Sequence, residues 1–293
     1  MLWKTAMSLH LARINSPHMN LNIRRVTSIH LPEFEPYLTL KRPLRHREQG
    51  FFVAEGEKVV RRLLESRLRI ISLLLTEEWL QVYRPLLESR TEMFEIYLAE
   101  KQQMEAIVGF QLHMGVMAVG EIPEGETVEQ ILARSKRPYF LVAVDGIMNA
   151  ENLGVIVRNC ASFGVHAILV GETSCDPYLR RAVRNSMGNV FSMPVVRLSN
   201  IAEDLPRIRS LSGSSLIAAH PRETSHPITK VNFRADCCIV FGSEGDGISK
   251  RVLDICDVAA TIPMNGGVDS INVASASAVA FYEVQRQRSL RET

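Results

Sequence analysis

The stretch from Ile262 to Tyr282 has side chains and backbone that could hold a ligand. It predicts the end of a strand, a glycine-rich loop and then a helix rich in Ala, Ser and Val that begins at Asn272. Asn272 is a favourable N-cap, because its side-chain oxygen can accept from the unpaired N–H groups of the first turn, and Ser270 offers a second oxygen. The plainer alternative is a buried helix after a turn.

Two further glycine-bearing segments lie upstream. One carries Asn152 and Arg158 after a continuous apolar run, Tyr139 to Val144, of the kind expected for a strand covered on both faces. The other carries Gly242 directly after the apolar run Cys238 to Phe241. No G-x-G-x-x-G follows the first strand, which disfavours a dinucleotide-binding fold. The three segments together fit one site.

The elements around these segments alternate between strands and helices. The run from Tyr139 to Val144 leads through a polar loop, residues 145–152, into a helix from about Leu153 to Phe163. Further short buried strands are predicted at Ala167 to Val170 and Ser215 to Ala219. This β-α-β order is typical of a parallel sheet between helices.

Residues 20–120 predict a smaller mixed domain. The pattern indicates a strand at Phe51 to Ala54, an amphipathic helix from Lys58 to Glu65 and a buried strand at Arg69 to Leu75. A last strand is predicted at His113 to Val119.

The length of the chain and a change in its composition favour two domains. A chain of 293 residues with 46% hydrophobic content can bury one large core or two modest ones, and the composition changes near residue 138. Residues 121–138 carry Pro, Gly and charge and read as a linker with a short helix, followed by the second domain at 139–293. Residues 1–19 are expected to be a poorly ordered leader, with a transit segment or an upstream start before Met19 as alternatives.

Charge is concentrated locally. The net charge of +2 does not by itself indicate a nucleic-acid partner. From Lys41 to Arg69, however, there are nine basic and four acidic residues, enough to matter for a polyanion. A second basic cluster holds Arg180, Arg181 and Arg184. Either cluster could instead be a solvated face.

Cysteine and hydropathy patterns exclude several classes of protein. No apolar run reaches the length that spans a bilayer. The five cysteines are odd in number and lack C-x-x-C spacing, which argues against a disulfide framework and a zinc site and favours a reducing cytosol. His220 has no companions at ligand spacing, so we expect a loop histidine and no metal.

Three motifs together resemble the SpoU/TrmH family of the SPOUT superfamily of RNA methyltransferases, which use S-adenosylmethionine to methylate a ribose 2′-hydroxyl. They are Asn152-x-Gly154-x-x-x-Arg158, the segment from Val240 to Ile248, and the segment from Ile262 through Ala274. Order and spacing match from Val142 to Val284. The chain departs from the family at Asn149-Ala150, where Asp-Pro is frequent, and at Ile271, where Leu is frequent.

The resemblance implies an α/β fold with two parts. The C-terminal part would be a trefoil-knotted SPOUT methyltransferase domain with a mostly parallel sheet, in which the chain from about Phe241 threads through an earlier loop. The N-terminal part would be a smaller α/β substrate-binding domain, which the segment from Lys41 to Ser66 resembles. The family also implies a homodimer formed through the knotted domain.

The resemblance assigns roles residue by residue. The catalytic set would be Arg158, Glu244, Asn152, Asn272 and Ser270. S-adenosylmethionine would be bound by Gly242, Ile262, Met264, Ile271, Glu244 and Gly247, and RNA by Lys41, Arg42, Arg45, Arg47, Arg180 and Arg181. An arginine is effectively always protonated, so we prefer an electrostatic role for Arg158, with Glu244 as an alternative base or as the group that orients Arg158.

The leading hypothesis is a cytoplasmic RNA ribose 2′-O-methyltransferase that acts on ribosomal RNA, with tRNA as the alternative substrate. A second hypothesis is a non-catalytic RNA-binding protein on the same scaffold, which the full set of site residues disfavours. A third is a related enzyme that methylates a base nitrogen, which the Ser270-Ile271-Asn272 triplet disfavours.

Overall fold

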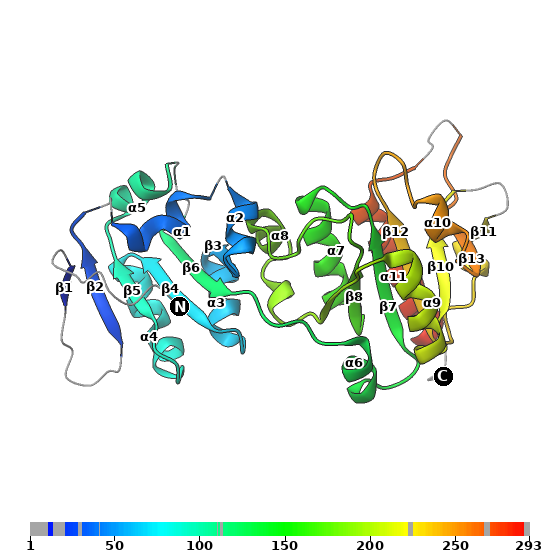
Figure 1. The fold of residues 1–293 in the computed structure, drawn as a ribbon, viewed down its shortest axis with the longest axis horizontal. Coiled ribbons are helices and arrows are strands. Elements are labelled where there is room, and N and C mark those ends of the chain that lie inside the picture. Colours follow the sequence, from blue (N-terminus) through cyan, green and yellow to red (C-terminus); the bar gives the residue numbers. More distant parts are fainter. Residues whose placement is uncertain are drawn as a thin grey trace. The chain divides into compact units, whose positions relative to one another are not determined.

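The computed structural model describes residues 11–13, 21–28, 31–40, 42–109, 111, 114–221, 225–266 and 270–289. These residues form two compact units (Figure 1). Unit 1 contains the chain up to Pro123 together with Tyr178–Arg184, and unit 2 contains Glu124–Pro177 and the chain from Asn185 onward. The division differs from the expected one in two ways: unit 2 begins within the expected linker, and a short segment from the second half of the chain belongs to unit 1.

Unit 1 is built on a mixed sheet of six strands in the order β1-β2-β5-β4-β6-β3. Strand β5 pairs parallel with both β2 and β4. Strand β1 pairs antiparallel with β2, and β6 pairs antiparallel with both β4 and β3. The strands are β1 Leu11–Arg13, β2 Asn22–Val26, β3 Phe51–Glu55, β4 Ile70–Leu75, β5 Glu95–Leu98 and β6 Val116–Glu121. The helices are α1 Glu35–Leu38, α2 Pro43–Glu48, α3 Glu57–Glu65, α4 Glu77–Glu88 and α5 Lys101–Val108.

Most predicted elements of unit 1 are confirmed. The strand at 51–54, the helix at 58–65 and the strand at 69–75 appear as β3, α3 and β4. The last strand, β6, begins at Val116 because Gly115 turns the chain with φ of 55°; His113 lies outside the described residues. Within the expected leader, Leu11–Arg13 pair with β2, so these three residues belong to the sheet.

The segment Tyr178–Arg184 has specific partners within unit 1. The ring of Tyr178 lies 5.4 Å from that of Phe52, and Arg180 forms an ion pair with Glu55. Arg184 approaches the same carboxylate at 4.0 Å. These contacts explain why most of helix α8, Arg180–Asn185, belongs to unit 1.

Unit 2 is organised around a sheet of seven strands in the order β11-β13-β10-β12-β7-β8-β9, and every described pair in it is parallel. The strands are β7 Phe140–Asp145, β8 Ala167–Val170, β9 Val195–Arg197, β10 Ser215–Ala219, β11 His226–Pro227, β12 Cys237–Gly242 and β13 Val258–Thr261. The helices are α6 Val128–Arg134, α7 Ala150–Ser162, α9 Ile201–Ser212, α10 Lys250–Leu253 and α11 Val273–Ser289. The expected parallel α/β class is confirmed.

Helices cover both faces of this sheet, as the continuous apolar strands predict (Figure 1). All six residues of β7 and all six of β12 are buried. One face packs against α6, α9 and α10. On the other face the ring of Phe281 in α11 lies 5.3 Å from Phe140 and 5.8 Å from Phe241 in edge-to-face contacts.

The start of one helix and the packing of another in unit 2 differ from the prediction. Helix α7 begins at Ala150, not near Leu153, because the Asn149 side-chain oxygen accepts from the N–H groups of Glu151 (2.8 Å) and Asn152 (3.3 Å). Asn149 thus caps the helix at one of the positions where the chain departs from the family pattern. The predicted linker helix, α6, buries its apolar residues in the core of unit 2.

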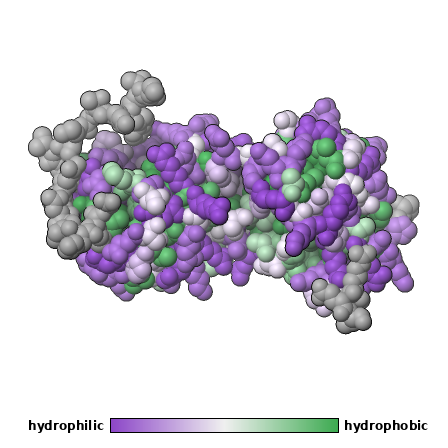
Figure 2. Space-filling model, turned by 90° about the horizontal axis from the view of Figure 1, so that it is seen from below, coloured by the Kyte–Doolittle hydropathy of each residue, from purple (hydrophilic) through white to green (hydrophobic). Residues whose placement is uncertain are grey.

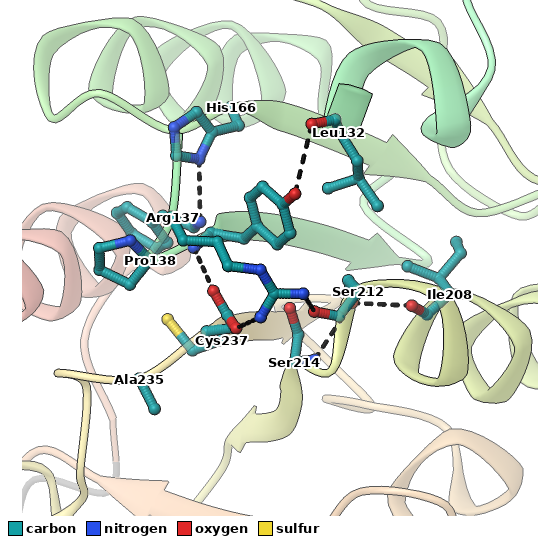
Figure 3. Close-up of polar contacts among 12 residues, drawn as sticks. Leu132, Arg137, Pro138, His166, Ile208, Ser212, Ser214, Ala235 and Cys237 are labelled. Atoms are coloured by element: carbon teal, nitrogen blue, oxygen red, sulfur yellow. Dashed lines mark hydrogen bonds and ion pairs between the residues drawn. The ribbon is translucent and has the colours of Figure 1, made fainter. Parts of the chain in front are cut away.

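A polar network holds the amino ends of the central strands (Figure 3). Arg137 donates to the Ser212 carbonyl (3.0 Å), and His166 Nδ1 accepts from the Phe140 N–H (3.0 Å). Arg288 of α11 donates to the carbonyls of Pro138 (3.0 Å), Tyr139 (2.9 Å) and Phe233 (3.0 Å). The last turn of α11 is therefore fixed to the start of β7 by charge-assisted hydrogen bonds.

Two findings bear on the class of protein. No helix in the described part of the chain is long and apolar enough to cross a membrane. All five cysteines are free thiols. The face of the molecule drawn in Figure 2 is mostly hydrophilic, with hydrophobic residues scattered over it.

His46 in α2 gives unit 1 a pH-sensitive contact. The side chain is 5% exposed and its Nε2 lies 2.8 Å from the Thr39 hydroxyl oxygen, which itself donates to the Glu35 carbonyl (2.7 Å). Nε2 is therefore the donor to Thr39. Burial, with Arg45 and Arg180 nearby, lowers the pKa of His46 to about 4.

We predict that unit 1 loses stability as the pH falls from about 6.5 to 4. In this range the unfolded chain binds a proton at His46 that the folded chain does not, so the free energy of unfolding decreases by about 2–3 kcal/mol. Urea unfolding of the wild type and of His46→Asn across this range measures the difference. An equally steep loss in the variant would show that His46 is not the group responsible.

Candidate active site

Two of the three predicted segments line one cavity in unit 2, and the third is joined to them by hydrogen bonds of Asn152 to Asn272 and Glu244. The cavity has a volume of about 410 Å³ and lies at the carboxyl ends of β10, β12 and β13, next to the first turns of α11. This position is the usual one for ligand sites in parallel α/β sheets. Its lining includes all six residues predicted to bind S-adenosylmethionine: Gly242, Glu244, Gly247, Ile262, Met264 and Ile271. Ser270 and Asn272 also line it.

The loop after β12 is closed tightly on itself. Ser243 and Gly247 exchange two backbone hydrogen bonds of 3.0 and 3.1 Å, and Gly247 has φ of 70°. A Cβ atom at Gly242 would lie 2.1 Å from both the carbonyl carbon of Gly247 and the nitrogen of Ile248. Only glycine fits there, so the backbone itself forms this wall of the cavity.

Asp145 anchors the far side of the same loop. It ends β7 directly beside Gly242 of β12, is 4% exposed, and accepts from the Ser249 N–H at 2.8 Å. This buried carboxylate couples the loop to the central strand. The sequence patterns did not single it out; its place at the end of a buried strand was the signal.

A chain of side-chain hydrogen bonds joins three predicted catalytic residues. Asn272 caps α11 as expected, with its oxygen 2.9 Å from the Ala274 N–H. Its Nδ2 donates to the Asn152 oxygen at 3.1 Å, and Asn152 Nδ2 donates to the Glu244 carboxylate. The first turns of α7 and α11 and the glycine-rich loop are thus connected through polar groups beside the cavity.

Helices α7 and α11 approach each other closely, as the small residues of α11 predict. Asn159 Nδ2 donates to the Ala274 carbonyl and to the Ser277 hydroxyl, both at 2.9 Å. Gly154, Ala274 and Ser277 are all buried. Reaching a backbone carbonyl of α11 from a side chain of α7 requires that no bulky side chain intervene.

Arg158 lies apart from this network. Its side chain is exposed on α7, is not part of the cavity lining, and makes no hydrogen bond or ion pair with any residue that the structure describes. Glu244 contacts Asn152 and not Arg158, so the alternative in which Glu244 orients Arg158 is not seen.

Some of the residues predicted to bind RNA form ion pairs within unit 1. Arg45 is paired with Glu35 at 2.9 Å and Arg180 with Glu55. Arg42, Arg47 and Arg181 are exposed, and Lys41 lies outside the described residues. Internal ion pairs therefore use part of the local positive charge.

His220 is a cavity residue that the sequence analysis did not assign to the site. It follows β10, and its ring nitrogen Nδ1 would lie 3.4 Å from a Cβ at Gly247. The signal was its position after a strand whose carboxyl end faces the site. Within the described ranges, no group of three or more His, Cys, Asp or Glu could hold a metal ion.

Comparison with known proteins agrees with this arrangement. The profile of the SpoU rRNA Methylase family matches residues 139–282. An uncharacterized tRNA/rRNA methyltransferase of Mycobacterium tuberculosis is 34% identical over 247 residues, which cover 81% of this chain and 82% of the relative. The 23S rRNA (guanosine-2′-O-)-methyltransferase RlmB of Yersinia pestis is 29% identical over 67% of this chain and 80% of its own length.

A solved structure shows the same fold. An AdoMet-bound rRNA methyltransferase from Sinorhizobium meliloti superposes with a TM-score of 0.78 at 23% identity, covering 90% of this chain and 98% of its own. The parallel α/β sheet, its cavity and these relatives define the class as RNA methyltransferase. Within that class, the chain belongs to the SpoU rRNA methylase family, which confirms the resemblance seen in the sequence.

We predict that alanine substitutions at two glycines of the same loop differ in their effect on stability. Gly242→Ala should lower the free energy of unfolding of unit 2 by at least about 2 kcal/mol, because the new methyl group meets backbone that cannot move aside. Gly245→Ala is the matched control, since a Cβ there meets nothing within 4 Å, and it should change stability by less than about 0.5 kcal/mol. Thermal unfolding of both variants tests this, and equal stabilities would refute the steric argument.

Proposed function

We propose that the protein transfers a methyl group from S-adenosylmethionine to a ribose 2′-hydroxyl of RNA, and that the substrate is ribosomal RNA. The observation that carries this proposal is the single cavity lined by all six residues predicted for the cofactor, with the linked amides and carboxylate of Asn272, Asn152 and Glu244 at its edge. The relative from Yersinia pestis, named as a 23S rRNA 2′-O-methyltransferase, supports the choice of substrate.

The cavity residues fit S-adenosylmethionine. A volume of about 410 Å³ suits a ligand of that size. Ile262, Met264 and Ile271 give an apolar wall for a planar base, while the backbone at Gly242 can approach polar groups without a side chain in the way. When bound, the cofactor would supply a methyl group on a sulfonium sulfur; the C–S bond breaks as the methyl group moves to the ribose oxygen, and the sulfur leaves as a neutral thioether.

The residues of the chain would act by position and charge. We assign Asn152 and Asn272 to holding the loop and ribose by hydrogen bonds, with Ser270 beside them, and Glu244 to orienting Asn152. Arg158, whose guanidinium has no partner in the described chain, is suited to hold an RNA phosphate and to stabilise the developing alkoxide.

We also propose that unit 1 contributes exposed arginines to RNA binding, Arg42, Arg47 and Arg181 among them. A homodimer through unit 2 is supported by the exposed face of α11, on which Val279 is 41% and Tyr282 60% exposed. The trefoil knot and a cytoplasmic location complete the proposal.

The test is product analysis. The protein is incubated with S-adenosylmethionine and unmodified ribosomal RNA, and separately with unmodified tRNA, and the digested nucleosides are separated by mass. A methyl group on ribose is expected. A methyl group on a base would support the base-methylating alternative, and no incorporation into ribosomal RNA or tRNA would support a non-catalytic RNA-binding protein.

Arg158→Ala should lower kcat by about 10²–10³-fold while S-adenosylmethionine binding is retained, because Arg158 lies outside the cavity lining. Arg158→Lys separates charge from base chemistry. Substantial activity with an unchanged pH profile in the lysine variant would exclude Arg158 as the sole base. Loss of cofactor binding in Arg158→Ala would contradict the division of roles.

A further inference from the structure

A second cavity, of about 690 Å³, lies in unit 1. It forms where the parallel strands β2, β5 and β4 end, with Arg25, Leu98 and Leu75 in register. Ligands of open parallel sheets bind at this edge. The part of the lining that matters here is Arg25, Thr76, Glu78, Trp79, Lys101 and Met114.

The charged groups of this cavity divide into paired and unpaired ones. Arg25 is held by Glu77 at 3.2 Å, and Glu100 forms the capping box of α5. Glu78 and Lys101, in contrast, are exposed and make no hydrogen bond or ion pair with any described residue. One carboxylate and one ammonium group are thus free to meet a ligand.

The net charge of the cavity lining restricts the kind of ligand that it can bind. Three carboxylates, those of Glu77, Glu78 and Glu100, line the cavity beside the two cations Arg25 and Lys101. A site for phosphate alone would not carry a net negative charge. A ring with N–H donors fits better, because it can stack on Trp79, pack on Met114 and donate to a free carboxylate, while its phosphate reaches Lys101.

We propose that this cavity binds an unpaired nucleobase that carries an amino group, guanine above all, from the RNA on which the protein acts. Guanine offers two adjacent N–H donors to one carboxylate, whereas uracil has no amino group. The RNA origin rests on the proposed function. The site is distinct from the basic residues Arg42, Arg45 and Arg47, which precede β3, an edge strand that does not line this cavity.

The experiment uses the two tryptophans of the chain. In a Trp3→Phe background Trp79 is the only source of tryptophan fluorescence. The fluorescence of this full-length protein is measured while it is titrated with 5′-GMP and 5′-UMP. Quenching by GMP at about tenfold lower concentration than by UMP is expected. No quenching by either nucleotide, or equal quenching by both, would overturn the proposal.

Glu78→Gln tests the carboxylate and retains the reporter. It should abolish the preference for GMP over UMP, whereas Glu88→Gln, an exposed position in the last turn of the same helix and outside the cavity lining, should keep it. A preserved preference in Glu78→Gln would remove Glu78 from the site.

A third titration separates RNA from free nucleotide. The trinucleotide UGU should bind more tightly than GMP, as measured by quenching of Trp79 fluorescence, because it has two phosphates in place of one and these can reach both Arg25 and Lys101. Quenching by GMP but not by UGU would overturn the RNA origin. Titration of S-adenosylmethionine by calorimetry reports on unit 2 independently, so failure of the proposed function would be recognised separately.

Discussion

The turn after β12 has no space for a side chain at Gly242, and the rest of the site depends on this close backbone approach. A Cβ would lie 2.1 Å from the atoms of Gly247 and Ile248. Because the chain folds back so tightly, Ile248 enters the core and the Ser249 N–H reaches the buried carboxylate of Asp145. The loop is thereby tied to β7, and the strand that follows it along the chain, β13, delivers Ile262 to the same cavity.

Helix α11 is fixed at both ends, which makes its first turn a rigid part of the site. At its start, Asn272 caps the helix and reaches Asn152 of α7. In its middle Phe281 packs against β7 and β12, and at its end Arg288 donates to carbonyls that precede both of these strands. Positioning of this kind is what a methyl transfer needs, because the reaction depends on alignment more than on protein acid–base chemistry.

Residues that the sequence patterns singled out line the cavity, because its walls are made by local patterns. Glycines mark close backbone approach, Asn272 marks a helix start, and the apolar strands of 139–144 and 238–241 mark a buried parallel sheet. Tertiary contacts account for what was missed. Arg180 looked like part of an exposed basic helix, but Glu55, 125 residues away in the sequence, pairs with it. His220 entered the site only because β10 ends there, and the cavity around Trp79 depends on three strands that are separate in sequence.

The central claim is that the backbone-lined cavity after β12 holds S-adenosylmethionine. Calorimetric titration of the wild type, Gly245→Ala and Gly242→Ala tests it most directly. We predict one site per chain in the wild type and Gly245→Ala, and no measurable binding in Gly242→Ala under conditions where that variant is folded. Binding by Gly242→Ala with unchanged affinity, or none by the wild type with and without RNA, would contradict the account.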